Sequence, residues 1–244
     1  MTTNDRKDRA IGSLLGLAIG DAVGTTLEFE GRDVRAELTD MVGGGPFNLK
    51  AGQWTDDTSM ALCLADSLLA NPGLDEVDLM TRFVRWWRDG ENSPTGSCFD
   101  IGMTTKNALA HFERTGDPIA GSTDETSAGN GSLMRLAPVA IRHHQDRPRA
   151  MEAARRQSTT THGAPQCLDA CSYWADLLLD AFNGTDKDQL LIPRTLRSHR
   201  AVASVANGSY LHRSRDEISS SGYVVHTLEA ALWATHTATN FRDA

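Results

Sequence analysis

The chain has 244 residues, of which 40% are hydrophobic, and its 24 Lys and Arg against 32 Asp and Glu give a formal net charge of −8. This composition is that of an ordinary globular protein, so intrinsic disorder and fibrous structure are excluded. A net negative charge offers no general attraction to phosphate backbones or anionic lipid. We therefore expect no nucleic acid and no membrane as partners.

The first predicted element is a helix near the N-terminus, where apolar residues recur at helical spacing from Ile11 to Ala18. The uncharged stretch from Ala10 to Gly20 is shorter than a membrane span and is followed by Asp21. The preceding residues 4–9 carry charges of both signs, unlike a signal peptide. Four cysteines without zinc spacing suit a reducing compartment. The sequence therefore predicts a cytoplasmic protein without a transmembrane helix.

Further helices are predicted wherever apolar residues recur every three or four positions. These segments run from Met60 to Leu68, Val77 to Trp87, Gly102 to Phe112, Leu133 to His143, Cys167 to Phe182 and Val224 to Thr237. Only short stretches such as Gly222 to Val225 hint at a strand. The Gly-rich loops between the helices do not resemble a flexible linker. The sequence predicts an all-α protein with one domain over residues 1–244.

A polar segment, Thr55-Asp56-Asp57-Thr58-Ser59, leads directly into the helix around Met60. In one interpretation, Thr55 or Asp56 caps this helix, and the acids lie favourably at its positive dipole end. However, residues 51–81 contain six acids and no Lys, Arg or His. Adjacent carboxylates without a compensating cation, together with a hydroxyl, are hard ligands suited to Mg²⁺, Mn²⁺ or Ca²⁺. The residues alone leave both interpretations open.

A glycine-containing segment, Gly129-Asn130-Gly131-Ser132, is followed by Arg135 at an expected helix start. Free amides, the helix dipole and the arginine would together form a phosphate cradle. The alternative is an ordinary turn followed by a surface arginine. Two further candidates are Asp100, as a helix cap or a functional acid, and His162, as a structural or a functional side chain.

Taken in order along the chain, these segments resemble the ADP-ribosylglycohydrolase family, which includes the dinitrogenase-reductase-activating glycohydrolases. The resemblance rests on Gly16 to Gly24 with Glu28, Gly52 to Thr58, Phe99 to Gly102, Gly129 to Arg135, Thr161-His162, and Ser221 to Val225 leading into Thr227 to Trp233. It extends over essentially the whole chain from Asp8 onward, and this combination of motifs is specific.

The resemblance implies an orthogonal helical bundle whose central cleft binds ADP-ribose and a pair of Mg²⁺ or Mn²⁺ ions. It implies hydrolysis of the glycosidic bond between ADP-ribose and a modified protein side chain, most commonly arginine. Carried over by position, the metal ligands are Thr55, Asp56 and Asp57, the catalytic residues are Asp100 and Glu28, and the substrate-binding residues are Gly129, Asn130, Gly131, Ser132, His162 and Tyr223.

The family also has an Asp-x-Asp-Ser/Thr motif shortly after the segment that matches Leu228 to Ala231, and this motif does not occur in residues up to Ala244. The Asp-x-Asp at Asp186 to Asp188 comes too early and lacks the hydroxyl residue. We therefore expect these 244 residues to bind ADP-ribose, to hold one ion weakly or none, and to hydrolyse ADP-ribosyl-arginine poorly. The alternative is a non-catalytic ADP-ribose-binding or structural relative.

Overall fold

The computed structural model describes residues 3–244, which form ten α-helices and three short 3-10 helices (η1 to η3) joined by loops. The α-helices are α1 (Thr3–Gly24), α2 (Asp56–Ala70), α3 (Glu76–Asp89), α4 (Met103–Thr115), α5 (Ala137–Arg142), α6 (Arg147–Thr159), α7 (Pro165–Phe182), α8 (Lys187–Leu190), α9 (Arg200–Ala206) and α10 (Val224–Thr237). The 3-10 helices are η1 (Thr25–Leu27), η2 (Glu125–Ser127) and η3 (Arg215–Glu217). Only isolated β-bridges occur in the described residues. The all-α prediction is confirmed.

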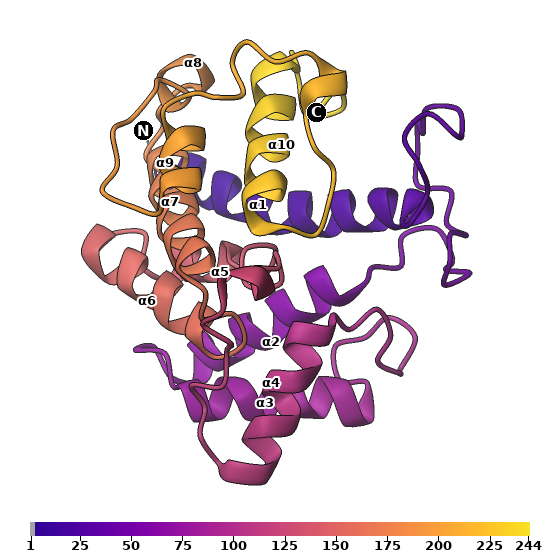
Figure 1. Ribbon diagram of the computed structural model, residues 1–244, viewed down its shortest axis with the longest axis vertical. Helices are drawn as coiled ribbons and strands as arrows, with labels where there is room; N and C mark the ends of the chain where they lie inside the picture. Colours follow the sequence, from indigo (N-terminus) through magenta and orange to yellow (C-terminus); the bar gives the residue numbers. More distant parts are fainter. Residues whose placement is uncertain (1–2) are drawn as a thin grey trace.

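Helix α7 is the central element of the bundle. It packs against α6, α5, α10 and α9, while α2 packs against α3 and α5. Figure 1 shows α2, α3 and α4 in the lower half of the molecule, α7 to α10 in the upper half, and α1 running crosswise between them. This crosswise arrangement agrees with the expected orthogonal bundle.

Local sequence explains where these helices begin and end. The Asp75 side chain accepts hydrogen bonds from the amides of Val77 and Asp78 and so caps α3. Gly90, with φ 72°, ends α3 in the left-handed conformation that favours glycine. Pro165 occupies the first turn of α7, where its missing amide hydrogen costs no helical bond.

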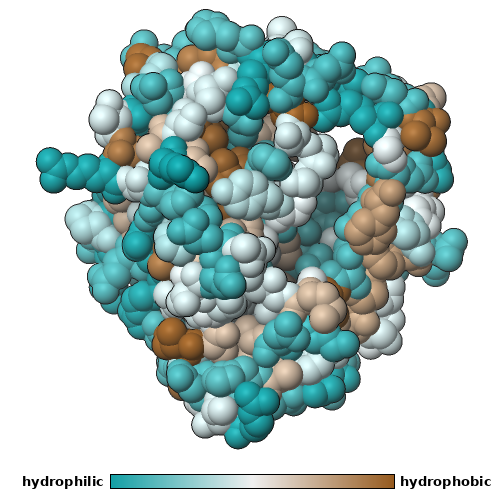
Figure 2. Space-filling model, in the orientation of Figure 1, coloured by the Kyte–Doolittle hydropathy of each residue, from teal (hydrophilic) through white to brown (hydrophobic). Residues whose placement is uncertain are grey.

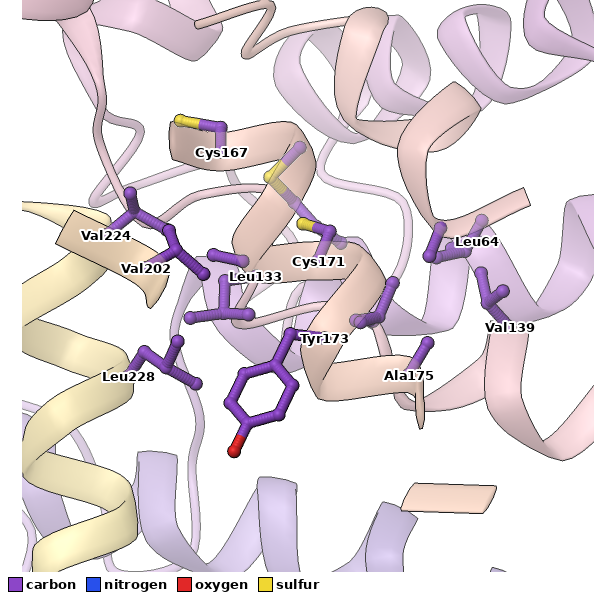
Figure 3. Packing of buried hydrophobic residues seen from close by; sticks show 14 of the residues in the cluster. Leu64, Leu133, Val139, Cys167, Cys171, Tyr173, Ala175, Val202, Val224 and Leu228 are labelled. Atoms are coloured by element: carbon purple, nitrogen blue, oxygen red, sulfur yellow. The ribbon is translucent and has the colours of Figure 1, made fainter. Parts of the chain in front are cut away.

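The hydrophobic core lies where α7 meets its neighbours. Figure 3 shows Cys171 and Tyr173 of α7 between Leu64 of α2 on one side and Leu228 of α10 on the other. All four side chains are at most 4% exposed. The cysteines of the chain are free thiols, as expected. The buried faces of five or more helices thus meet in one continuous cluster.

Two of the predicted elements are wrong in detail. The helix expected from Leu133 to His143 begins only at Ala137, and residues 131–135 form turns. Pro138 lies in the first turn of α5, and since proline donates no amide hydrogen bond and disfavours helical backbone before it, the helix begins there. The strand suggested at Gly222 to Val225 is a single bridge between Gly129 and Tyr223, after which α10 begins.

Helix α1 is long and apolar enough to cross a membrane, although we expect no transmembrane helix from the sequence. By length and composition alone, Asn4–Leu27 would pass as a membrane-crossing helix, and only 17% of its most apolar window is buried. Core helices of soluble proteins and signal sequences satisfy the same criteria. In this structure α1 contacts α2, α5 and α7, and its Asp21 bonds to α2, as described next.

Candidate active site

The carboxylate of Asp21 holds the end of α1 against the beginning of α2. It accepts hydrogen bonds from the amides of Thr55 (2.9 Å) and Thr58 (3.1 Å) and from their hydroxyls (2.8 and 2.6 Å). The amides at the start of α2 are therefore capped from another helix. Thr55 makes no capping bond with its own side chain, so it is not the side-chain cap of α2, whereas Asp56 and Asp57 do lie in the first turn of this helix, as the capping interpretation expects. Sequence reasoning assigned no role to Asp21.

Five carboxyl groups interact around this point: Asp21, Glu28, Asp56, Asp57 and Asp100. Burial raises the pKa of Asp56 well above its usual value, and repulsion from the other four acids raises it further. Burial and repulsion from Asp21 and Glu28 raise the pKa of Asp57 to about 7. No cation is among the groups that shift these two pKa values. The fold thus brings together acids from four separate segments, and none of them forms an ion pair within residues 3–244; the positive charge that interacts with Asp56 is that of the buried Arg135.

Asp100 and Glu28 form a pair within this cluster. Burial, repulsion from Glu28 and a hydrogen bond to Glu28 raise the pKa of Asp100 to about 8. Burial also raises the pKa of Glu28, while the bond from Asp100 opposes that shift. These directions place the shared proton on Asp100. Asp100 does not cap α4, because the residue before the helix is Gly102 and no side-chain capping bond is present there.

The cluster opens into a pocket of about 320 Å³, which is lined by Gly20, Asp21, Gly24, Thr25, Glu28, Thr55 and Asp57. A larger hollow of about 1050 Å³ adjoins it at Gly24 and is lined mainly by residues 30–38. Figure 2 shows this face hollowed beside the segment that follows α1. Arg215 forms a bidentate ion pair with Asp33 and ties this segment to η3. The acids therefore lie at the inner end of an open cleft.

The donor set of the cluster has the chemistry of a divalent-cation site. Carboxylate and hydroxyl oxygens are the ligands that Mg²⁺ and Mn²⁺ prefer, and a cation would offset the repulsion among the acids. Within residues 3–244, however, no three His, Cys, Asp or Glu side chains are already arranged to hold an ion. The fit therefore rests on the chemistry of the donors and their charge.

The raised pKa values predict how the stability of the metal-free protein depends on pH. A carboxyl with a raised folded-state pKa binds its proton more tightly when folded, so stability is lost as the pH rises through that pKa. Asp57 and Asp100, with pKa values of about 7 and about 8, lose this contribution progressively as the pH rises from about 4, near their unfolded-state pKa, to about 8.5. Burial lowers the pKa of His143 and His162. These two residues therefore make the protein more stable as the pH rises, and most of that gain is reached by about pH 6.5.

We therefore expect the Tm in a chelating buffer to fall as the pH is raised from about 6.5 to about 8.5. Asp100→Asn should flatten this slope, because it removes one of the two titrating groups. A scanning calorimetry series at constant ionic strength measures both. A Tm that rises over this interval would contradict the raised pKa values of Asp57 and Asp100.

The glycine segment forms a second group of contacts, together with His162 and Tyr223. A methyl group on Gly131 would lie 2.7 Å from Cε1 of His162, and one on Gly129 would lie 3.3 Å from its Nε2. Gly129 forms the bridge with Tyr223, and the Asn130 amide donates to the carbonyl of Gly222 (2.9 Å). The structure therefore brings these predicted substrate-binding residues together.

The expected phosphate cradle needs correction in three respects. The amides of Gly129 and Asn130 already donate within the protein, whereas those of Gly131 and Ser132 donate to no other atom of residues 3–244. The Ser132 hydroxyl is fully buried and bonds to Ser158 (2.8 Å). Arg135 is also fully buried, so it neither reaches a phosphate nor lies on the surface. Two backbone amides remain as donors.

Contacts with α4 and α2 connect the glycine segment to the elements around the acidic cluster. A methyl group on Gly131 would lie 3.3 Å from the hydroxyl of Thr105, one turn into α4 and close to Asp100. Arg135 contacts the sulfur of Met60 in α2 at 3.9 Å. Tyr223 packs edge-on against His226, with ring centroids 5.0 Å apart. These contacts connect the glycine segment to α2 and α4.

A helical bundle with such a cleft is the architecture that the sequence resemblance implies, and the comparisons with known proteins agree. The family profile described as ADP-ribosylglycohydrolase matches residues 2–244. This chain belongs to the ADP-ribosylglycohydrolase family. A solved structure described as an ADP-ribosylglycohydrolase-related protein complex is similar with a TM-score of 0.86 and 40% identity, over 98% of this chain and 79% of that chain.

Among curated proteins, the chain is 51% identical over its whole length to an ADP-ribosylarginine hydrolase, Tri1, of Pseudomonas putida (strain GB-1). It is 46% identical over 97% of its length to the protein of the same name in Serratia proteamaculans (strain 568). It spans 66% and 64% of these two relatives, less than two thirds of each. An ADP-ribosyl-[dinitrogen reductase] glycohydrolase of Rhodospirillum rubrum is 32% identical over 95% of this chain and 75% of its own.

Proposed function

We propose that the protein is a divalent-cation-dependent, cytoplasmic hydrolase that releases ADP-ribose from modified arginine side chains of proteins. The observation that carries this proposal is the cluster of five acids at the start of α2, three of which (Asp21, Glu28 and Asp57) line an open pocket. The names of the two relatives that are 51% and 46% identical support arginine as the modified residue.

The glycine segment and the acidic cluster would bind different parts of the substrate. The Gly131 amide, which has no partner among residues 3–244, would bind the diphosphate, because a free backbone N–H donor favours an anion. The acidic end would receive the ribose that carries the guanidine. When bound, a divalent ion would supply Lewis-acid stabilisation of charge on the ribose oxygens; Thr55, Asp56 and Asp57 would hold it.

We assign the acid and the base of the hydrolysis to Asp100 and Glu28, which are hydrogen-bonded to each other without substrate and must separate to admit the water. A water molecule attacks the anomeric carbon and gives its proton to Glu28, while the bond from that carbon to the guanidine nitrogen breaks. The bonding electrons leave with the nitrogen, which takes the proton that Asp100 holds. Carboxylates nearby stabilise the positive charge that develops on the ribose. The products are ADP-ribose and an unmodified arginine.

The alternative function is a non-catalytic ADP-ribose-binding relative. It is favoured by the observation that residues 3–244 contain no ready-made metal site. The two functions differ in a direct assay, in which the protein is mixed with ADP-ribosyl-arginine and Mn²⁺ and released ADP-ribose is measured. Release that a chelator abolishes supports the hydrolase. Tight binding of ADP-ribose without any release supports the binding protein.

Gly131→Ala should weaken ADP-ribose binding by about tenfold or more, because overpacking a closed site typically costs 1–3 kcal/mol. The added methyl would lie 2.7 Å from the ring of His162 and displace it. Gly12→Ala on α1 is the matched control, because a methyl there meets no atom within 4 Å. Calorimetric titration with ADP-ribose measures the effect. Equal affinities of the two variants would place ADP-ribose elsewhere.

A further inference from the structure

A fully buried arginine, Arg135, lines neither pocket and forms no hydrogen bond with a carboxylate among residues 3–244. Arg135 donates from Nε to the side-chain oxygen of Gln157 and from Nη2 to the backbone carbonyl of Gln157 and the hydroxyl of Thr161, each at 2.9 Å. Its guanidinium lies 4.5 Å from the centre of the Phe83 ring. These contacts fix the guanidinium in one orientation.

The contact between Arg135 and Thr161 determines the direction of the next hydrogen bond. A guanidinium only donates hydrogen bonds, so the Thr161 oxygen must accept from Arg135. The hydroxyl has one hydrogen of its own, and its other neighbour in the described residues is Nδ1 of His162, at 2.8 Å. If Nδ1 carried a proton, the buried hydroxyl hydrogen of Thr161 would be left without an acceptor.

We propose that Arg135 and Thr161 are positioning residues that hold His162 as the neutral tautomer protonated on Nε2, so that Nε2 donates a hydrogen bond to an oxygen of ADP-ribose. The ligand in this statement rests on the proposed function, whereas the tautomer rests only on the hydrogen bonds of the protein. Arg135 therefore acts on the substrate through two intervening side chains.

The surroundings of the ring agree with this assignment. Burial and the positive charge of Arg135 lower the pKa of His162 to about 3, so the ring stays neutral at physiological pH. Its backbone is held by Ser158, which accepts from the His162 amide (2.7 Å) and donates to its carbonyl (2.8 Å). Nε2 faces Gly129 and Gly131 and has no hydrogen-bond partner among residues 3–244. One donor thus points at the glycine segment.

The tautomer can be measured directly in the ligand-free protein. Two-bond ¹H–¹⁵N correlation spectra of protein labelled with ¹⁵N-histidine distinguish a protonated from an unprotonated ring nitrogen, and a His162→Asn sample assigns the resonance. We expect Nε2 protonated and Nδ1 unprotonated, without change from about pH 5 to pH 8. A proton on Nδ1, or a doubly protonated ring, at neutral pH would overturn the proposal whether or not ADP-ribose binds.

Substitutions of Thr161 test the positioning role without removing the buried charge. Thr161→Val keeps the shape but not the hydroxyl that donates to Nδ1, so the resonances should show a mixture of the two neutral tautomers and the affinity for ADP-ribose should fall about tenfold. Thr161→Ser restores the hydroxyl and should restore both. Thr159→Val is the matched control, because the Thr159 hydroxyl bonds to the Arg156 carbonyl, away from His162.

Two results would contradict the positioning role. If Thr161→Val keeps the wild-type tautomer, the hydroxyl does not determine it. If the tautomer changes but ADP-ribose binds with unchanged affinity, Nε2 is not a donor to this ligand. Failure of the wild-type protein to bind ADP-ribose would overturn the ligand part together with the proposed function, while the spectra would still decide the tautomer.

Discussion

Asp100→Asn should lower the rate of ADP-ribosyl-arginine cleavage by a factor on the order of 10² or more, as expected for loss of acid–base assistance. The carboxamide has nearly the same size as the carboxylic acid but cannot give a proton to the departing guanidine. Asp100 has a φ of 58°, in the left-handed region, and asparagine is among the few non-glycine residues that tolerate it. The backbone should therefore be undisturbed.

The stability of the Asp100→Asn variant separates catalysis from folding. Because Asp100 holds its proton near pH 7, the substitution removes no charge there, and we expect the Tm at neutral pH to be unchanged or raised. Asp117→Asn, in an exposed turn outside the cluster, is the control for loss of a carboxylate as such. A drop in activity that follows a comparable drop in the Tm would assign Asp100 a structural role instead.

Asp56→Asn should lower the affinity for Mn²⁺ by at least about tenfold, since it removes a full charge from a site made of hard oxygen donors. Asp56 is only 8% exposed, and its pKa is raised by burial and by the four neighbouring acids. Its neutralisation should therefore stabilise the metal-free protein. At Mn²⁺ concentrations 100-fold above the dissociation constant, the wild-type protein gains about 2.7 kcal/mol, and a tenfold weaker variant gains about 1.4 kcal/mol.

The thermal shift on adding Mn²⁺ measures this difference between the two proteins. Asp66→Asn is a control on the same helix, because Asp66 bonds to Asn92 and is not among the acids that shift Asp56. An equal Mn²⁺ response of Asp56→Asn and the wild-type protein would mean that Asp56 does not hold the ion.

The fold class and much of the site could be predicted from the sequence because their patterns are local. Helical periodicity is a property of neighbouring residues, as in α3 and α7. Pro138 shortened α5 because a single residue without an amide hydrogen outweighed an apolar pattern. The short helices α8 and α9 were not predicted, since 4 and 7 residues are too few to display a helical period.

The roles of Asp21 and Arg135 depend on contacts between distant segments, which no local pattern contains. Asp21 lies 34 positions before Thr55, its hydrogen-bond partner. The one available indication was that Asp21 is the first charged residue after the uncharged stretch from Ala10 to Gly20. Arg135 follows a glycine-containing turn and so suggested an anion site, but the fold buries it against Gln157 and Thr161. The roles of Asp21 and Arg135 follow from the residues that the fold places beside them and not from their residue type.

The central claim is that the acidic cleft hydrolyses ADP-ribosyl-arginine with the help of a divalent cation. The most direct test is a single-turnover assay with the 244-residue protein in excess over ADP-ribosyl-arginine, with Mn²⁺ or with a chelator, for the wild-type protein and for Asp100→Asn. We predict slow release of ADP-ribose that requires Mn²⁺ and falls on the order of 10²-fold in the variant. Release that neither the chelator nor the substitution changes, or no release from substrate that is bound, would contradict the account.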